Sequence, residues 1–156
     1  MNTSYTISAQ NLCKTFTAPD GKPFNAVNDI GLQVEKGRLT ALVGPDGAGK
    51  TTLMRMVAGL LRPDSGSLSV LGTDVAKAPQ TVQNRISYMP QRFGLYEDLS
   101  VQENLDLYAD LHGVPHNIRQ ERFARMLEMT DMARFTTRPA GKLSGGMKQK
   151  LGLACT

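Results

Sequence analysis

The stretch Gly44-Pro45-Asp46-Gly47-Ala48-Gly49-Lys50-Thr51, followed by Thr52, decides what fold and chemistry to expect of this chain. It matches the pattern G-x-x-x-x-G-K-[ST] of the phosphate-binding loop, or P-loop. Its glycines allow a tight turn that brings backbone N–H groups close to phosphate oxygens. Lys50 places a positive charge beside the terminal phosphates, and the Thr51 hydroxyl is a ligand for Mg²⁺. We therefore expect a nucleotide site at residues 44–52.

The sequence on either side of this loop has the pattern that a P-loop needs. Residues 39–43 (Leu-Thr-Ala-Leu-Val) are apolar and β-forming, which predicts a buried strand. After the loop, apolar residues recur at helical spacing, and these are Leu53, Met56, Val57, Leu60 and Leu61. Strand, glycine-rich turn and helix together favour a true P-loop over a glycine-rich turn that happens to precede a lysine.

The composition indicates a globular protein of one domain. The chain has 156 residues, of which 40% are hydrophobic and 21% charged, with a formal charge of +4. This mild excess of positive charge forms no basic stripe interleaved with aromatic residues, so we expect no nucleic-acid partner. No apolar run approaches the ~20 residues of a membrane span, and no signal peptide is recognisable. We therefore expect a cytoplasmic protein that reaches a membrane only through a partner.

The cysteines and histidines do not suggest a metal or disulfide site. Cys13 and Cys155 form no C-x-x-C pair, so we interpret them as buried or free thiols in a reducing compartment. His112 and His116 have helical i, i+4 spacing, but Gly113 and Pro115 lie between them and break the helix that such a metal pair would require.

An antiparallel β section is predicted before the P-loop. Residues 5–16 alternate between polar and apolar side chains, which indicates a strand. A turn is expected at residues 19–21 (Pro-Asp-Gly), and two further strands within residues 24–35. After the loop, the patterns predict strands at 68–72 and 86–89 and a weak helix at 80–85.

The rest of the chain is predicted to be helical. Ser100 and Glu103 form a capping box that opens a helix, which should end at residues 113–115, and a second helix is expected over 119–129. We therefore divide residues 1–156 into a P-loop core with the antiparallel section (1–98), a helical insert (99–143) and the start of a further helix (144–156). The fold class is α/β, a P-loop NTPase core with an antiparallel β section and an α-helical insert.

A second motif, Leu-Ser-Gly-Gly-Met at residues 143–147, follows the insert. Ser144 suits the N-cap of a helix, and the two glycines leave the first amides of that helix bare, which favours anion binding. Taken by itself, the motif is explained equally well as a simple capped helix.

Three segments occur in the order found in one family: GPDGAGKTT, YMPQRFGLYEDLSVQENL and LSGGMKQKLGLA. With them the chain resembles the ATP-binding subunit, or nucleotide-binding domain, of ABC transporters, and is most similar to the ABC-2-type exporters of drugs or ions. The resemblance implies that the chain binds Mg-ATP and that the complete protein hydrolyses ATP to drive export. It implies two partners, a transmembrane permease and a second nucleotide-binding domain, and a location on the cytoplasmic face of the membrane.

The resemblance also implies roles for individual residues. Phe16 matches the aromatic residue that stacks on adenine, although a core strand residue would also suit that position. Gln91 matches the catalytic glutamine that contacts Mg²⁺ and the attacking water, so that Thr51 and Gln91 are the implied metal ligands. The signature residues, which contact the nucleotide bound by the partner domain, match Ser144, Gly145 and Gly146. The loop at residues 92–99, with Phe93 and Tyr96, matches the surface that docks on the permease.

The sequence departs from the family pattern at three places. Asp46 stands where Asn or Ser is usual, and Met147 replaces the Gln of the signature motif. The family's Walker B aspartate, catalytic glutamate and switch histidine are not in this sequence, so we interpret it as a fragment that by itself is inactive. Two alternatives stay open: a truncated module that binds nucleotide without turnover, and a soluble ABC ATPase of translation or DNA repair.

Overall fold

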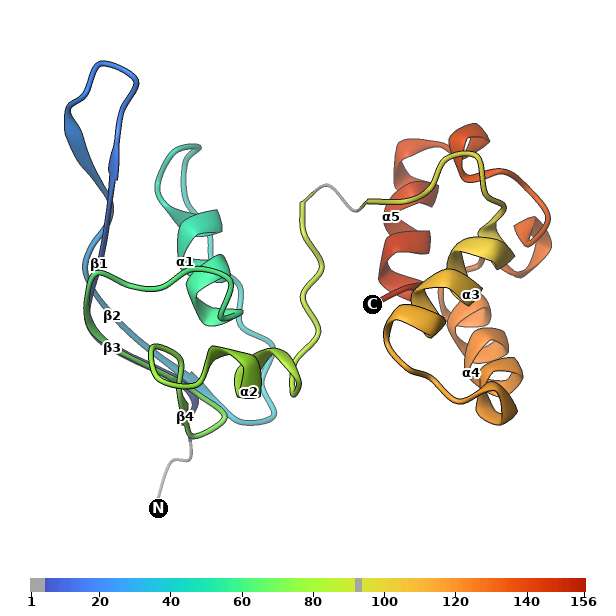
Figure 1. The fold of residues 1–156 in the computed structure, drawn as a ribbon, viewed down its shortest axis with the longest axis horizontal. Coiled ribbons are helices and arrows are strands. Elements are labelled where there is room, and N and C mark those ends of the chain that lie inside the picture. The colour runs from blue at the N-terminus through green and yellow to red at the C-terminus, as the bar shows by residue number, and fades with distance from the viewer. Residues whose placement is uncertain (1–4, 92–93) are drawn as a thin grey trace. The chain divides into compact units, whose positions relative to one another are not determined.

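The computed structural model describes residues 5–91 and 94–156, and the chain forms two compact units, residues 1–86 and 87–156. The four named strands of the described residues all lie in the first unit, and the second unit is built from helices (Figure 1). Each unit has a hydrophobic core of its own. Within the described residues, no helix has the length and apolar character needed to cross a membrane.

A long antiparallel hairpin forms the backbone of the first unit. Strand β1 (Tyr5–Thr17) pairs with β2 (Pro23–Glu35), and the predicted turn joins them, with Gly21 at φ +81°. The prediction of two strands within residues 24–35 is wrong, because β2 is continuous. A bulge replaces the expected break: Asn11 and Asp29 both have positive φ, and the Asn11 side chain donates a 2.8 Å hydrogen bond to the Asp29 carboxylate.

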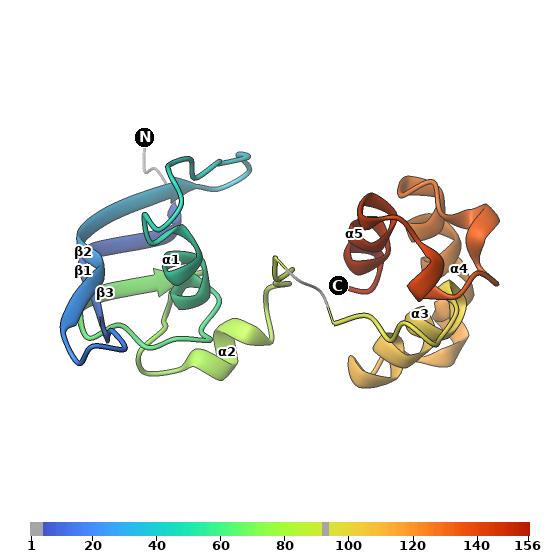
Figure 2. The ribbon, with the colours of Figure 1, turned by 90° about the horizontal axis from the view of Figure 1, so that it is seen from above.

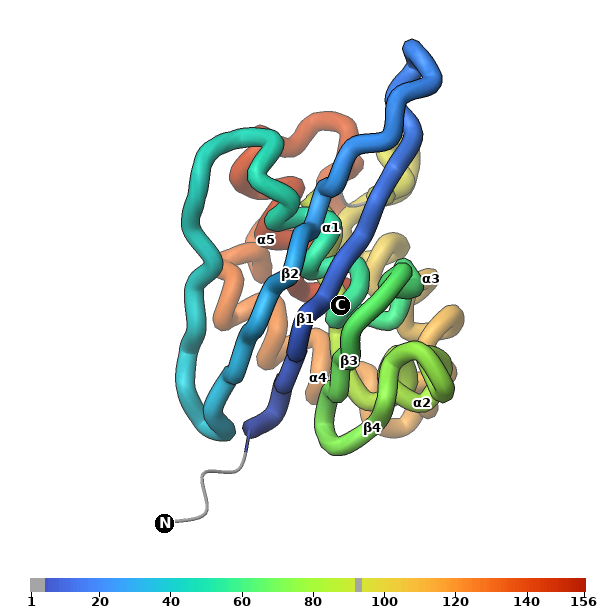
Figure 3. Tube along the Cα trace, turned by 90° about the vertical axis from the view of Figure 1, so that its left-hand side faces the viewer, coloured from blue at the N-terminus to red at the C-terminus, as the bar shows by residue number. Residues whose placement is uncertain are grey.

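Two shorter strands complete a sheet of order β2-β1-β3-β4, in which every neighbouring pair is antiparallel. Figure 3 shows β2, β1 and β3 side by side. Strand β3 (Ser65–Val70) starts three residues before the predicted run and ends before Leu71, because Leu71 and Gly72 form a two-residue turn to β4 (Thr73–Asp74). Both turn residues have positive φ, as a type I′ hairpin requires.

Helix α1 (Lys50–Val57) covers one face of this sheet (Figure 2), and α2 (Pro79–Gln83) lies in the same unit. Three residues of the predicted apolar stripe are buried: Leu53, Met56 and Val57. Leu60 lies beyond the end of α1 and stays exposed. The core of the unit gathers apolar side chains from the sheet, α1, α2 and the segment between β4 and α2, namely Ala9, Leu12, Val27, Leu53, Met56, Val57, Leu68, Val70, Val75 and Val82.

The strands predicted at residues 39–43 and 86–89 are absent. Residues 38–45 have no regular structure, and the side chain of Val43 is 88% exposed instead of buried. A strand exists only where a neighbouring chain accepts and donates its backbone hydrogen bonds. No described strand pairs with either segment, so an apolar, β-forming composition is not sufficient to make them strands.

The described residues of the second unit form three helices and two short 3₁₀ turns. The helices are α3 (Val101–Leu111), α4 (His116–Met129) and α5 (Gly145–Ala154), and the turns are η1 (Ala133–Phe135) and η2 (Ala140–Lys142). Helix α4 begins three residues before the predicted start. The core of the second unit draws on all three helices. Its buried residues are Val101, Leu105, Leu127, Met132, Ala140, Leu143, Leu151 and Cys155. Burial raises the pKa of the Cys155 thiol to about 12.

The predicted capping box at the start of α3 is confirmed. The Glu103 amide donates to Ser100 Oγ at 3.2 Å, and the Ser100 amide donates to Glu103 Oε2 at 2.8 Å. The bond from the Ser100 amide holds the pKa of the Glu103 carboxyl below its usual value. A depressed carboxyl pKa stabilises the fold above the unfolded-state value, so this contribution is lost when acidification protonates Glu103.

Asn104, on the same helix, holds the loop that precedes α3 by hydrogen bonds. Its side chain is fully buried. Its Oδ1 accepts a hydrogen bond from the Tyr96 amide at 3.0 Å, and its Nδ2 lies within 3.2 Å of the carbonyl oxygens of Tyr96, Leu99 and Ser100. Each of these carbonyls also accepts a backbone N–H bond, from Leu99, Ala140 and Asn104 respectively. Asn104 therefore matters most as the acceptor for the Tyr96 N–H.

We expect Asn104→Leu to free residues 94–100 from α3. Leucine is similar in size but leaves the Tyr96 N–H without its acceptor, and one orphaned buried donor costs about 1–3 kcal/mol. Hydrogen exchange of the full-length protein should show the opening free energy of these amides reduced by that amount. Gln102→Leu is the control, because among the described residues the Gln102 side chain makes one hydrogen bond, of 3.3 Å to Asp106, and its backbone bond is unaffected by the change. Equal exchange in both variants would contradict the role given to Asn104.

Candidate nucleotide-binding site

The loop at residues 44–52 leads directly into α1. Gly47 and Gly49 adopt left-handed backbone conformations, with φ of +78° and +83°, and Gly49 is the N-cap of the helix. No side chain caps the first turn of α1, and that turn contains no acidic residue. The amides of this turn and the positive end of the helix dipole therefore favour an anion at the loop.

The ammonium group of Lys50 closes the loop on itself. Its Nζ donates to the carbonyl oxygen of Gly44 at 2.8 Å and to that of Pro45 at 2.6 Å. These bonds hold a positive charge over the loop without pairing it with a carboxylate. A phosphate oxygen is a stronger acceptor for an ammonium than a neutral carbonyl, so the charge is placed where a phosphate group can take it over.

The approach of Gly49 to the hairpin fixes the position of the loop. A Cβ atom at Gly49 would overlap the carbonyl oxygen of Ala26 and would lie 3.6 Å from a methyl group of Val27, both on β2. At Gly47, in contrast, no described atom lies within 4 Å of a Cβ. The last glycine of the motif is therefore required by packing as well as by its left-handed conformation.

Three other loop residues differ in their surroundings. Thr51 is exposed in the first turn of α1, and Thr52 is half-buried behind it. The Thr51 hydroxyl is the hard oxygen donor that Mg²⁺ prefers. Within residues 5–91 and 94–156, no group of three His, Cys, Asp or Glu side chains is placed to hold a metal. The side chain of Asp46 is exposed.

Phe16 belongs to the same unit and lies near the end of β1. Phe16 is 36% exposed, and Phe24, directly opposite on β2, is 50% exposed. The two ring centroids lie 6.0 Å apart at an interplanar angle of 34°. The partial exposure of Phe16 argues against the alternative that it is a core strand residue.

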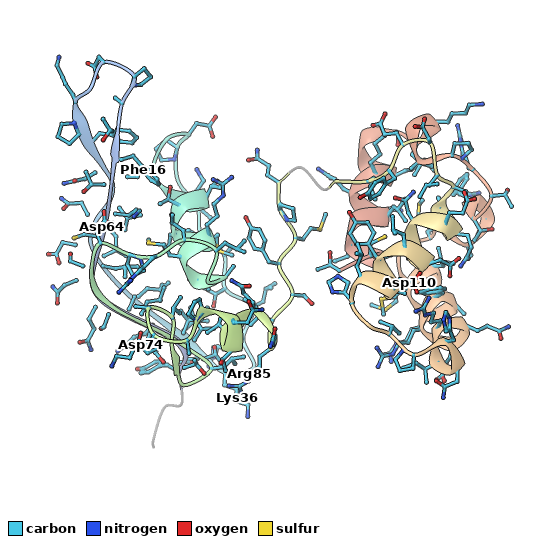
Figure 4. The ribbon with its side chains drawn as sticks, viewed as in Figure 1. Phe16, Lys36, Asp64, Asp74, Arg85 and Asp110 are labelled. Carbon is cyan, nitrogen blue, oxygen red and sulfur yellow. The ribbon has the colours of Figure 1, made fainter. Side chains whose placement is uncertain are left out.

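Lys14, whose side chain is largely buried, supports Phe16 from the same strand. Lys14 Nζ lies 5.7 Å from the Phe16 ring centroid and forms a 2.6 Å ion pair with Asp64. Asp64 also accepts a 2.7 Å hydrogen bond from the Thr15 amide. The Lys14 bond, followed by the Thr15 bond, holds the pKa of the Asp64 carboxyl below its usual value. Figure 4 labels Phe16 and Asp64 in this part of the first unit.

The sequence patterns missed Lys14, Asp64 and Phe24. Lys14 shares a face of β1 with Phe16 because side chains alternate along a strand. Phe16 and Phe24 lie at equal distances from Asp20, so a hairpin centred on the predicted turn would have placed them opposite each other. The pairing with Asp64, 50 residues from Lys14, carries no sequence signal.

The remaining predicted residues lie in the second unit. Gln91 is exposed, in a segment without regular structure. Of the expected docking loop, Phe93 falls outside the described residues, while Tyr96 is 54% exposed. The Tyr108 hydroxyl holds the loop by a 2.6 Å bond to the Gly94 carbonyl, and Lys148 of α5 pairs with Glu97 at 2.6 Å.

The signature segment forms the N-terminus of α5. Ser144 is its N-cap, with Oγ accepting from the Met147 amide at 3.3 Å, as predicted. A Cβ at Gly145 or Gly146 would meet no described atom within 4 Å. The start of α5 is therefore open, and its first amides are accessible to a ligand. The loop at residues 44–52 and Phe16 both belong to the first unit, and Gln91 and residues 144–146 belong to the second.

Comparison with known proteins identifies relatives over almost the whole chain. Residues 27–156 match the family model described as "ABC transporter". The chain is 58% identical over 150 residues to the "Probable multidrug ABC transporter ATP-binding protein YbhF" of Escherichia coli (strain K12). That match covers 96% of this chain and 25% of the relative, so the chain spans about a quarter of that protein.

Solved structures share the fold. "Structure of ATP binding subunit of ABC transporter" is 30% identical, with a TM-score of 0.79, over 97% of this chain and 61% of the other. The "Dimeric structure of a post-hydrolysis state of the ATP-binding cassette MJ0796 bound to ADP and Pi" superposes with a TM-score of 0.82 at 22% identity, over 96% of this chain and 68% of that one. These matches confirm the predicted α/β class with a P-loop core.

The two left-handed glycines of the loop provide a matched test of its packing. Gly47→Ala should cost about 1–2 kcal/mol of folding stability, the strain of a left-handed alanine. Gly49→Ala should cost clearly more, because its methyl group also overlaps the backbone of β2. Denaturant unfolding of the two variants measures the difference. Equal losses of stability would show that Gly49 is not packed against Ala26.

Proposed function

Because the chain belongs to the ABC transporter family and carries the P-loop of its ATP-binding subunit, we propose that residues 44–52 bind Mg-ATP. The complete protein then hydrolyses ATP to drive export through a transmembrane permease. The observation that carries this proposal is the geometry of Lys50: its ammonium is held over the loop by two carbonyl oxygens, at the uncapped start of α1. An accessible cation and bare helix amides at one point are suited to a phosphate chain.

Each part of the loop has its own task in this proposal. The amides of the loop and the first turn of α1 donate to phosphate oxygens, and Lys50 exchanges its two carbonyl partners for the β- and γ-phosphates. Thr51 supplies a hydroxyl ligand for Mg²⁺, which neutralises charge on the phosphates when bound. Phe16 provides an exposed ring on which the base stacks.

The remaining roles in this proposal fall to Gln91 and residues 144–146. Gln91 orients the attacking water and is a second ligand for Mg²⁺. Being neutral, it is a poor general base. Ser144, Gly145 and Gly146 present the open N-terminus of α5 to the nucleotide held by a second copy of the domain. This arrangement requires a dimer of nucleotide-binding domains.

The loop at residues 92–99 is the proposed contact with the permease, which would hold the protein at the cytoplasmic face of the membrane. Tyr96 exposes an aromatic ring there, although backbone bonds to Asn104 hold its main chain firmly. An exposed aromatic residue on a fixed backbone is typical of a docking surface. The multidrug designation of the E. coli relative supports export of a drug-like compound.

Lys50→Ala tests the nucleotide site. Removing the ammonium should weaken binding of a fluorescent ATP analogue by about tenfold or more, since bonds to charged groups are worth about 1.5–3 kcal/mol. Lys22→Ala is the control: among the described residues, the ammonium of this exposed lysine at the hairpin turn pairs with Asp20, at 3.5 Å. Unchanged affinity after Lys50→Ala would refute the assignment.

The 156 residues taken alone should bind ATP without turning it over. Hydrolysis needs a carboxylate to hold the metal and another to position water, and the printed sequence contains no Asp-Glu pair of the Walker B type. Asp46, Glu97 and Asp98 are the possible substitutes, but all three side chains are exposed in loops. Phosphate release by the purified chain measures turnover. Release that disappears after Lys50→Ala would prove this expectation wrong.

A further inference from the structure

Two exposed aromatic rings lie beside the P-loop, and the proposed function uses only one of them. Phe16 and Phe24 are direct partners in the pairing of β1 with β2, so their side chains share one face of the hairpin. Both rings stay largely outside the core, with Phe24 the more exposed at 50%. A hairpin that needed these rings only for packing would gain more free energy by burying them.

The hairpin brings this pair close to the phosphate-binding loop. Gly49 touches β2 at Ala26, which is two residues from Phe24. Two residues of a strand span about 6–7 Å, which is within the length of a nucleotide. The base of a nucleotide whose phosphates lie at residues 44–52 therefore has both rings within reach.

Phe16 is held more firmly than Phe24. On β1, the ammonium of Lys14 lies 5.7 Å from the Phe16 ring centroid, and the ion pair with Asp64 fixes that ammonium. The Lys14 side chain is only 14% exposed. The Phe24 ring lies against that of Phe16, with the two centroids 6.0 Å apart and an interplanar angle of 34°. Because the rings are tilted, one flat base can stack on one ring and touch the other.

We propose that Phe24 is a second base-contacting residue, so that the nucleobase site is a two-ring platform with one ring from each strand of the hairpin. The inference rests on the proposed function, in which residues 44–52 bind the triphosphate. Stacking on aromatic rings depends on the area of the base and tolerates its identity. The platform therefore favours purine over pyrimidine nucleoside triphosphates.

The test compares Phe24→Leu with Tyr5→Leu in the full-length protein that contains this chain. Leucine keeps an apolar side chain and removes the ring. Tyr5 is a similarly exposed aromatic residue, 40%, at the opposite end of the same hairpin, where it pairs with Glu35. Calorimetry with ATP, CTP and inorganic tripolyphosphate separates contacts to the base from contacts to the phosphates.

We expect Phe24→Leu to weaken ATP binding by about fivefold or more, the lower limit for loss of a base stack. CTP should be affected less, tripolyphosphate should bind as before, and Tyr5→Leu should leave all three affinities unchanged. Phe24→Tyr, which restores a ring, should bind ATP like the wild type.

Two outcomes would overturn the inference. If Phe24→Leu binds ATP like the wild type, Phe24 does not contact the base; if ATP and tripolyphosphate weaken together, Phe24 supports the hairpin only. Lys50→Ala tests the proposed function independently of the base contact. If this variant binds tripolyphosphate as tightly as the wild type, residues 44–52 are not the phosphate site and the proposed function itself is wrong.

A fluorescence measurement decides the question should Phe24→Leu fail to fold. The 156 residues contain no tryptophan, so Phe24→Trp adds a reporter to the platform. ATP should change its emission, measured as the difference from the wild-type protein, and tripolyphosphate should not. Identical responses to the two ligands would reject base contact at this position.

Discussion

The contact between Gly49 and the carbonyl oxygen of Ala26 is the constraint on which the first unit depends. It places the start of α1 against β2, and with it the uncapped amides and the Lys50 ammonium. Only glycine satisfies both demands at this point, a left-handed backbone and the absence of a Cβ atom. The anion site is thus a property of how the helix meets the hairpin, and the lysine adds charge to a geometry that packing has already set.

The same contact relates the phosphate site to the aromatic pair, because Ala26 is two residues from Phe24 on β2. Phe16 is oriented by Lys14, which is in turn held by Asp64 at the entrance to β3. The position of one ring therefore depends on β1 and on the residue that precedes β3. The second unit uses a buried side-chain amide instead: Asn104 bonds to backbone groups of the loop before α3 through both its oxygen and its nitrogen, so that a loop without regular structure keeps a defined course.

Local patterns located most elements of the chain, because their causes lie within a few residues. The capping box of Ser100 and Glu103, the N-cap of Ser144 and the turn at Gly21 are interactions between neighbours, and all three formed as predicted. The strand predicted at residues 39–43 did not form, because a strand depends on a partner that is distant in sequence. A strand needs a partner, which an apolar run cannot supply by itself, and no described strand pairs with this segment.

The sequence by itself determined the P-loop, the signature segment and the family, since each is a short pattern whose residues act on their neighbours or on a ligand. The tertiary structure decided where the hairpin stands and what surrounds each predicted residue. Lys14 and Asp64 are 50 residues apart, and Phe24 meets Phe16 only because β1 and β2 pair in one register. Register and long-range ion pairs follow from the packing of whole strands and helices, which no local pattern encodes.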